Sequence, residues 1–313
     1  MAANDRTASV PDAPLCAGPD LDPRKPKLRL PPLATDCHAH VCGPAERYPY
    51  WSGRVYTPPD CLPAAYRHML GTLGVERAVL VQPSVYWTDN RAMLDAMQSA
   101  GDSYRGVAVV EDSVSGAEID SLHAAGVRGV RCNIVDVVED KGKLPLAMLG
   151  RLADKIQRHG WHIELLMHAD EFPDMDRAFA DFPVHIVLGH LGYMRTDKGL
   201  DNPGFQALLQ LMRLGKAWAK LTGPYRISTG PMPHADTNAY AHALLNAAPN
   251  RVVWGTDWPH VMAKGPMPND ADLCDLLETW APDAELRKRV LVDNAAALYG
   301  FPESSPAVQS DGR

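Results

Sequence analysis

Short apolar runs alternate with longer amphipathic segments along most of this chain. Eight of the runs have the length and residue types of β-strands, and they lie at 34–41, 77–82, 104–110, 127–135, 161–167, 184–188, 218–221 and 251–255. The segments between them place apolar residues at helical spacing, as in Leu144, Leu149, Leu152 and Ile156. Alternating strands and helices predict a parallel sheet, and eight repeats favour an α/β fold closed into a (β/α)8 TIM barrel. An open doubly wound sheet is the alternative, but no glycine-rich nucleotide-binding motif follows the first run.

The two ends of the chain differ in composition from the region between them. Residues 1–30 are rich in Pro, Asp and Lys, which predicts an extended N-terminal arm. Residues 31–301 contain all eight strand-like runs and the helical segments between them, and they form one predicted barrel domain. Within it, the apolar positions of 268–299 indicate closing helices. Residues 302–313 contain Ser and Pro and are expected to form a flexible tail.

The composition limits the classes of partner. The formal net charge of -7 disfavours sequence-independent binding of nucleic acid, which needs a basic surface. No run approaches the roughly 20 apolar residues of a membrane span, and the first thirty residues lack the apolar segment of a signal peptide. The six cysteines show no CxxC spacing, so reduced thiols are the default interpretation. The sequence therefore predicts a cytoplasmic protein with no nucleic-acid or membrane partner, and it leaves a homo-oligomer open.

The end of the first apolar run carries a pair of histidines, His38 and His40. In an extended strand, residues i and i+2 point to the same side, so the two imidazoles project together. Imidazole suits zinc and neighbouring transition metals, but two ligands do not make a site. Cys37 and Cys42 lie close enough in sequence for thiolate ligation, although we interpret them as small buried apolar residues.

Three later runs also end in groups that bind metals. His168 ends the fifth run, His190 the sixth and Asp257 the eighth. A single histidine at a strand end is more often a hydrogen-bonded structural residue than a ligand, so the prediction rests on the combination. The carboxyl ends of barrel strands form the active face. The pattern therefore indicates an enzyme built around a metal site or a former metal site.

Six motifs resemble the amidohydrolase superfamily and, within it, the amidohydrolase 2 group. They lie at 36–40, 81–90, 128–131, 189–192, 220–226 and 254–260, and the last, which reads WGTDWPH, is highly characteristic. The likeness covers almost all of 36–301 and is strongest to the dicarboxylate lactonase branch.

The resemblance implies a role for each residue at the strand ends. It implies that His38, His40, His168 and Asp257 hold one divalent metal ion, with zinc the favoured metal. A second ion is not expected, because binuclear members add a carboxylated lysine after the fourth strand and 131–135 contains no lysine. Asp257 is then also the catalytic base, and His190 polarises the substrate carbonyl or assists proton transfer.

Arginine and hydroxyl side chains supply candidate substrate contacts. Arg131 and Arg226 follow strand ends, where each guanidinium can bind a carboxylate or sulfonate through two hydrogen bonds. The resemblance adds Ser84 and Tyr56, which match hydroxyls that contact substrate in the lactonase branch.

Two departures from the metal-independent pyrone-dicarboxylate-type lactonases of that branch affect these expectations. Those enzymes have a tyrosine in the fifth strand and no histidine at its end, where this chain has Leu166 and His168. This difference favours the metal-dependent relatives. They also have a second arginine six residues after the match to Arg131, where this chain has Val137. That difference argues against a substrate with its two carboxylates in the same places.

We therefore predict a metal-dependent hydrolase that opens an anionic lactone, carboxylated or sulfonated, such as a muconolactone, in aromatic-compound catabolism. Two alternatives from the same superfamily stay open: a decarboxylase with the same ligands, and a metal-independent lactonase. A non-catalytic binding barrel is the alternative from another class.

Overall fold

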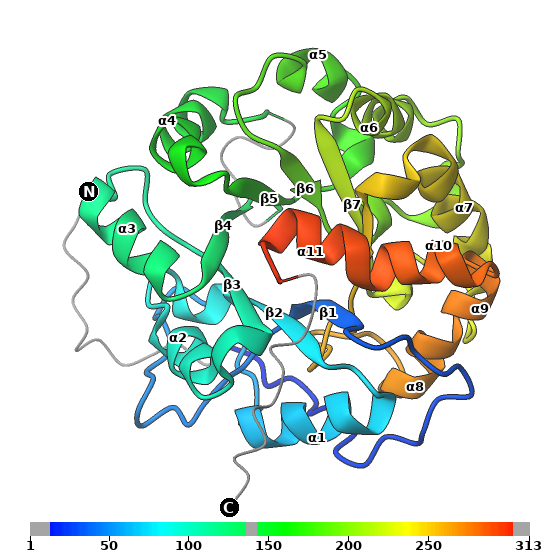
Figure 1. Cartoon of the computed structure of the whole chain (residues 1–313), viewed down its shortest axis with the longest axis horizontal. Coiled ribbons are helices and arrows are strands. Elements are labelled where there is room, and N and C mark those ends of the chain that lie inside the picture. The colour runs from blue at the N-terminus through cyan, green and yellow to red at the C-terminus, as the bar shows by residue number, and fades with distance from the viewer. Residues whose placement is uncertain (1–12, 136–142, 303–313) are drawn as a thin grey trace, which may run out of the picture.

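The computed structural model describes residues 13–135 and 143–302. Eight parallel strands form one sheet in chain order, from β1 to β8. Figure 1 labels β1 to β7 around the barrel. Their bounds are β1 Thr35–Ala39, β2 Arg77–Val81, β3 Tyr104–Ala108, β4 Val127–Asn133, β5 His162–Leu166, β6 Ile186–Leu188, β7 Ala217–Leu221 and β8 Val252–Trp254. Each predicted strand is present, and the (β/α)8 barrel is confirmed.

Helices surround the strands in Figure 1, and α11 lies across the end of the barrel that faces the viewer. The helices are α1 Pro63–Leu73, α2 Arg91–Gln98, α3 Gly116–Ala124, α4 Leu146–Ile156, α5 Met175–Phe179, α6 Pro203–Arg213, α7 Asn238–Ala247, α8 Asp270–Asp275, α9 Leu277–Trp280, α10 Ala284–Lys288 and α11 Asn294–Tyr299. The ring of Tyr299 contacts His162 at the start of β5, with centroids 5.3 Å apart. Since α11 thus covers the end where the strands begin, the opposite end is left for the active site.

Local sequence explains where the outer helices begin and end. The Ser115 hydroxyl accepts a hydrogen bond from the Glu118 amide and caps α3. Asn202 caps α6 in the same way, and Pro203 occupies the first helical position, where its missing N–H is not needed. Gly74 ends α1 in the left-handed conformation, with φ of 78°.

A β-bulge in β1 changes the direction of the side chains that approach the site. Asp36 pairs with Ala78 and Ala39 with Leu80, so three steps along β1 match two along β2. The extra residue lets Cys37 join the apolar cluster inside the barrel while His38 still faces the site. Bulges beside active sites commonly re-aim side chains in this way.

The buried carboxylate of Asp36 fastens β1 to the end of β8. Its Oδ1 accepts hydrogen bonds from the amides of His38 and Thr256, at 3.0 and 2.9 Å. Its Oδ2 accepts from the hydroxyls of Tyr66 and Thr256, at 2.9 and 2.6 Å. The strands pass so closely that a Cβ on Gly255 would lie 2.6 Å from the His38 nitrogen. These contacts close the barrel and fix the backbone beneath the histidine pair.

The described part of the predicted arm, residues 13–30, packs on the barrel. Arg24 forms ion pairs with Asp272 and Asp275 of α8, and the amides of Lys27 and Leu28 donate to Asp275. Residues 1–12 and all of the predicted tail except Pro302 lie outside the described residues. Within the described ranges, no helix is long and apolar enough to cross a membrane.

Candidate active site

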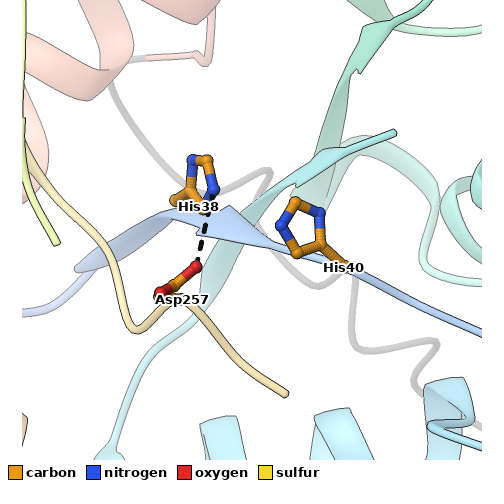
Figure 2. A group of neighbouring side chains, drawn as sticks. All are labelled: His38, His40 and Asp257. Atoms are coloured by element: carbon orange, nitrogen blue, oxygen red, sulfur yellow. Dashed lines mark ion pairs between the residues drawn. The ribbon is translucent and has the colours of Figure 1, made fainter. Parts of the chain in front are cut away.

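Three buried side chains converge at the carboxyl end of the barrel: His38 and His40 at the end of β1, and Asp257 after β8. Figure 2 shows the two imidazoles and the carboxylate facing a common space. One ligand atom from each lies within 4.8 Å of the others, and His38 Nε2 lies 3.7 Å from Asp257 Oδ1. The sequence-predicted pair is thus joined by the predicted aspartate.

Hydrogen bonds to the far side of each ring leave the inner nitrogens available as ligands. His40 Nδ1 lies 2.7 Å from the carbonyl oxygen of Val81. Because a carbonyl only accepts, Nδ1 carries the proton and Nε2 keeps its lone pair. His38 Nδ1 lies 3.3 Å from Glu164 Oε1 and 3.3 Å from Lys220 Nζ. The Lys220 ammonium donates at shorter range to two oxygens. We therefore place a proton on His38 Nδ1, which donates it in a hydrogen bond to Glu164 Oε1.

Two buried atoms in this group lack a hydrogen-bond partner in the described part of the chain: His38 Nε2 and Asp257 Oδ1. Buried polar atoms are nearly always satisfied, and these two face the same space. Two imidazole nitrogens and one carboxylate oxygen are donors that zinc accepts. The residues therefore fit a divalent ion. Cys37 and Cys42 are buried and are not members of the group.

Burial favours the neutral form of His38, His40 and His190. It lowers the pKa of His38, with a further contribution from the Lys220 charge. It holds the pKa values of His40 and His190 well below the usual value, and the charge of Arg131 lowers both further. Neutral imidazoles can bind a metal ion, whereas imidazolium ions cannot.

A buried ion pair lies beneath His38. Lys220 Nζ, on β7, lies 2.5 Å from Glu164 Oε2, on β5, and donates to the carbonyl of Cys37 at 2.8 Å. Burial alone would raise the pKa of Glu164, but Lys220 and His38 hold it well below the usual range. The sequence pattern pointed to neither residue. The available signal was a lone charged residue inside an apolar strand, as in Ile163-Glu164-Leu165.

The second oxygen of Asp257 is held by two donors from the loop after β7. Arg226 Nε and the Tyr225 hydroxyl each donate to Oδ2 at 2.5 Å. The Tyr225 oxygen also lies 3.0 Å from His260 Nδ1, and His260 Nε2 lies 3.1 Å from Asp270 Oδ1. Burial would raise the pKa of Asp257, but the charge and hydrogen bond of Arg226 hold it well below its usual range. This chain of groups fixes the carboxylate so that Oδ1 faces the histidines.

His190 lies beside Asp257 where the backbone of both residues is strained. Both have positive φ, 51° and 68° respectively, a conformation that costs energy for non-glycine residues and is common at functional sites. His190 Nδ1 lies 3.9 Å from Asp257 Oδ2 and has no hydrogen-bond partner among the residues described. A Cβ on Gly223 would lie 2.9 Å from that nitrogen and 2.7 Å from Asp257 Oδ2. Glycine at this position therefore keeps the space beside His190 open.

The predicted fourth ligand, His168, is not a member of the three-residue group. Its Nδ1 donates to the carbonyl oxygen of Tyr193 at 2.7 Å, and its ring stacks on the Tyr193 ring with centroids 4.6 Å apart. This bond leaves Nε2 with its lone pair, as in His40. Tyr193 also contacts the ring of His190, with centroids 5.1 Å apart. The role of His168 as a ligand stays a prediction.

The residues predicted to bind substrate lie in two places, one at the cavity and one beside Asp257. Arg131 and Ser84 line a cavity of about 290 Å³ at the ends of β2, β3 and β4. Tyr56 is buried. Arg226, in contrast, is bound to Asp257 Oδ2. Arg131 and Arg226 were both predicted to bind an acidic group of the substrate, but they have different surroundings.

Known proteins resemble this chain over most of its length. A 2-pyrone-4,6-dicarboxylate hydrolase of Comamonas testosteroni is 40% identical, over 90% of this chain and 94% of that protein. A 4-sulfomuconolactone hydrolase of Hydrogenophaga intermedia is 34% identical, over 93% of this chain and 97% of that protein. A crystal structure from Pseudomonas putida, provisionally named a 2-pyrone-4,6-dicarboxylic acid hydrolase, has a TM-score of 0.76 at 33% identity, over 88% of this chain and 99% of that chain.

These matches confirm the resemblance seen in the sequence motifs. The amidohydrolase family profile matches residues 35–301, from the first residue of β1 to the end of the described barrel. The chain belongs to the amidohydrolase family.

Proposed function

We propose that this hydrolase opens the ring of a lactone that carries a carboxylate or sulfonate, with the help of one bound divalent ion. The observation that carries the proposal is the unpartnered pair of His38 Nε2 and Asp257 Oδ1, close to a cavity lined by Arg131. The relatives named above act on lactones with acidic groups. A muconolactone-type compound from aromatic-compound catabolism is the proposed substrate class.

His38, His40 and Asp257 are the proposed ligands, and His168 is proposed as the fourth. The donor set of imidazoles and a carboxylate favours zinc. Once bound, the ion would polarise the ester carbonyl and make a water acidic enough for a weak carboxylate base to deprotonate. That help is needed, because the pKa of Asp257 is held well below its usual range.

The residues around the ligands have separate proposed roles. Asp257 Oδ1 accepts a proton from the attacking water and returns it to the ring oxygen when the C–O bond breaks. The neutral ring of His190 donates its N–H to the carbonyl oxygen as negative charge develops there. Arg131, with Ser84 and Tyr56, holds an acidic group of the substrate in place.

Arg226 was predicted to bind an acidic group of the substrate. Its Nε is bound to Asp257, and one Nη donates to the Val261 carbonyl at 3.0 Å. We propose that it orients Asp257, and that any contact with substrate uses the remaining Nη.

A panel of carboxylated, sulfonated and neutral lactones tests the proposal. Ring opening is followed by ultraviolet absorbance, and released carbon dioxide is measured in parallel. The proposal expects ring opening of at least one acidic lactone, faster than that of its neutral analogue, with no carbon dioxide. Release of carbon dioxide from an aromatic or muconate acid would instead favour the decarboxylase alternative. Inactivity toward every lactone would overturn the proposal.

A further inference from the structure

We propose that Arg54, which sequence analysis did not identify, binds a second acidic group of the substrate and thereby determines specificity. The inference rests on the proposed function and makes it narrower: the lactone carries two acidic groups on an apolar skeleton. Arg54 and Arg131 line the same cavity, and together they would bind the two ends of such a molecule.

The walls between the two arginines are mostly apolar. Val109 and Val110 follow β3, and Met148 and Leu152 belong to α4. The rings of Trp51 and Trp87 stack with centroids 4.9 Å apart and also line the cavity. Trp87 is nonetheless 44% exposed. A flat, unsaturated skeleton suits this surface because it can contact aliphatic and aromatic side chains together.

Arg131 is the inner of the two arginines. It is buried, and its Nη1 donates to the carbonyl oxygen of Gln82 at 3.1 Å. The preceding residue, Val81, holds His40 through its own carbonyl. Because Arg131 and His40 bind the carbonyls of adjacent residues, and Arg131 also lines the cavity, this arginine joins the cavity to the histidine pair. No carboxylate from residues 13–135 or 143–302 forms an ion pair with it.

Arg54 is partly exposed and is held only by neutral groups. Its Nε donates to the Thr57 hydroxyl at 2.9 Å, and its Nη1 donates to the Trp51 carbonyl at 3.4 Å. Its guanidinium carbon lies 5.8 Å from the centre of the Tyr50 ring. In the part of the chain that is described, no carboxylate pairs with Arg54.

Other arginines on the barrel do form ion pairs with carboxylates. Several exposed ones have a carboxylate within 2.7 Å, and these are Arg47, Arg91, Arg151, Arg158 and Arg195. Among the residues described, the two arginines of the cavity thus have no ion-pair partner, and they lie beside an apolar surface, where an anion is bound more strongly than in water. Arg54 can supply the second positive charge that the sequence lacks at Val137, a position outside the described residues.

The first test compares a muconolactone-type lactone bearing two carboxylates with two analogues in which one or the other carboxylate is replaced by methyl. We expect the wild type to prefer the diacid over the better monoacid by about 10-fold or more in kcat/KM, the size expected for charged hydrogen bonds. Arg54→Ala and Arg54→Gln should reduce this preference to near one, mainly through KM. Arg213→Ala, on the exposed face of α6, is the matched control and should keep the wild-type preference.

Binding of inert anions separates this inference from lactone hydrolysis. Isophthalate should bind the wild type about 10-fold or more tightly than benzoate in calorimetry, and Arg54→Gln should abolish the difference. If the wild type opens no lactone but shows this Arg54-dependent preference, the proposed function fails while the second anion site stands. If both Arg54 variants are folded by circular dichroism and keep a preference within threefold of wild type in either test, the inference is wrong.

Discussion

The two carboxylate oxygens of Asp257 have different surroundings, and this difference underlies its proposed roles. Oδ2 accepts from Tyr225 and Arg226, whereas Oδ1 has no hydrogen-bond partner in the described part of the chain. Asp257→Asn should keep the fold and most substrate affinity but lose most turnover, because an amide cannot accept the proton of water. Steady-state kinetics, with circular dichroism as the control for folding, tests this. Turnover within a few-fold of the wild type would show that Asp257 is not the base.

Glu164 is expected to act on the metal through His38. Glu164→Gln removes the carboxylate that accepts the Nδ1 proton, and loss of such a partner typically weakens metal binding about 10–100-fold. The same change leaves Lys220 buried without its partner, which costs about 3–5 kcal/mol of stability. Equilibrium dialysis with zinc measures the first effect and thermal unfolding the second.

Two controls separate these effects of Glu164→Gln. Adding Lys220→Met removes the unpaired charge, so the double variant should regain stability but not zinc affinity. Glu278→Gln, on the exposed surface of α9, should change neither. If Glu164→Gln binds zinc as tightly as the wild type, the charge of Glu164 does not strengthen metal binding through His38.

Side chains of the site differ in how far sequence could predict them. His38, His40 and Asp257 were identified because several histidines and an aspartate at the ends of strands are seldom all structural residues. Glu164 and Lys220 were missed because each satisfies the other across the barrel, and a side-chain contact between residues 56 positions apart is not visible in a local pattern. Arg54 was missed because the loop after β1 has no periodicity that places it over the cavity.

The elements were predicted more completely than their ends. Predicted strands 77–82, 104–110 and 161–167 extend beyond β2, β3 and β5. The apolar pattern continues past these strands because the first loop residues are also buried, as Gln82 and Met167 are. The bulge in β1 was not predictable, since it depends on how β1 pairs with β2 and leaves no mark in the alternation of residues.

Asp236 connects the loops that follow β6 and β7 at the rim of the barrel. It accepts hydrogen bonds from the hydroxyls of Ser228 and Thr196, at 2.6 and 2.5 Å, and from the Thr229 amide at 2.8 Å. Burial would raise its pKa, but these three donors lower it to about 2, from 3.8. Because the folded state holds this proton less tightly than the unfolded chain, the stabilisation is complete above pH 3.8 and is lost as pH falls toward 2.

Asp236→Asn should therefore lower the stability at pH 6, by about 1–2 kcal/mol after allowance for solvent screening. The deficit should shrink at pH 3, because the carboxyl of the unfolded chain, with a pKa of 3.8, is already mostly protonated there while the folded carboxylate is still ionised. Thermal unfolding at both pH values measures the change, and Asp201→Asn, at an exposed position, is the control. A deficit of equal size at both pH values would show that ionisation of Asp236 is not its cause.

At the scale of the whole molecule, the barrel explains why residues far apart in sequence form one site. The eight strands run in chain order around the sheet, so the end of β8 returns to β1 and brings Asp257 to His38. The amide of Asp257 donates to the His38 carbonyl at 2.8 Å, and the amide of His40 donates to the Trp258 carbonyl at 2.8 Å. The alternation of strands and helices was sufficient to predict this closure. It was not sufficient to predict which polar groups would meet inside.

The central claim is that ring opening of an acidic lactone depends on one divalent ion held by this group of residues. It is tested by titrating zinc into chelator-treated protein and measuring the initial rate on a lactone that the untreated protein opens. We predict a rate near zero without zinc and a rise to a plateau at about one equivalent per chain, the number that one set of His and Asp ligands can hold. Full activity of the zinc-free protein, unchanged by added metal, would contradict the account.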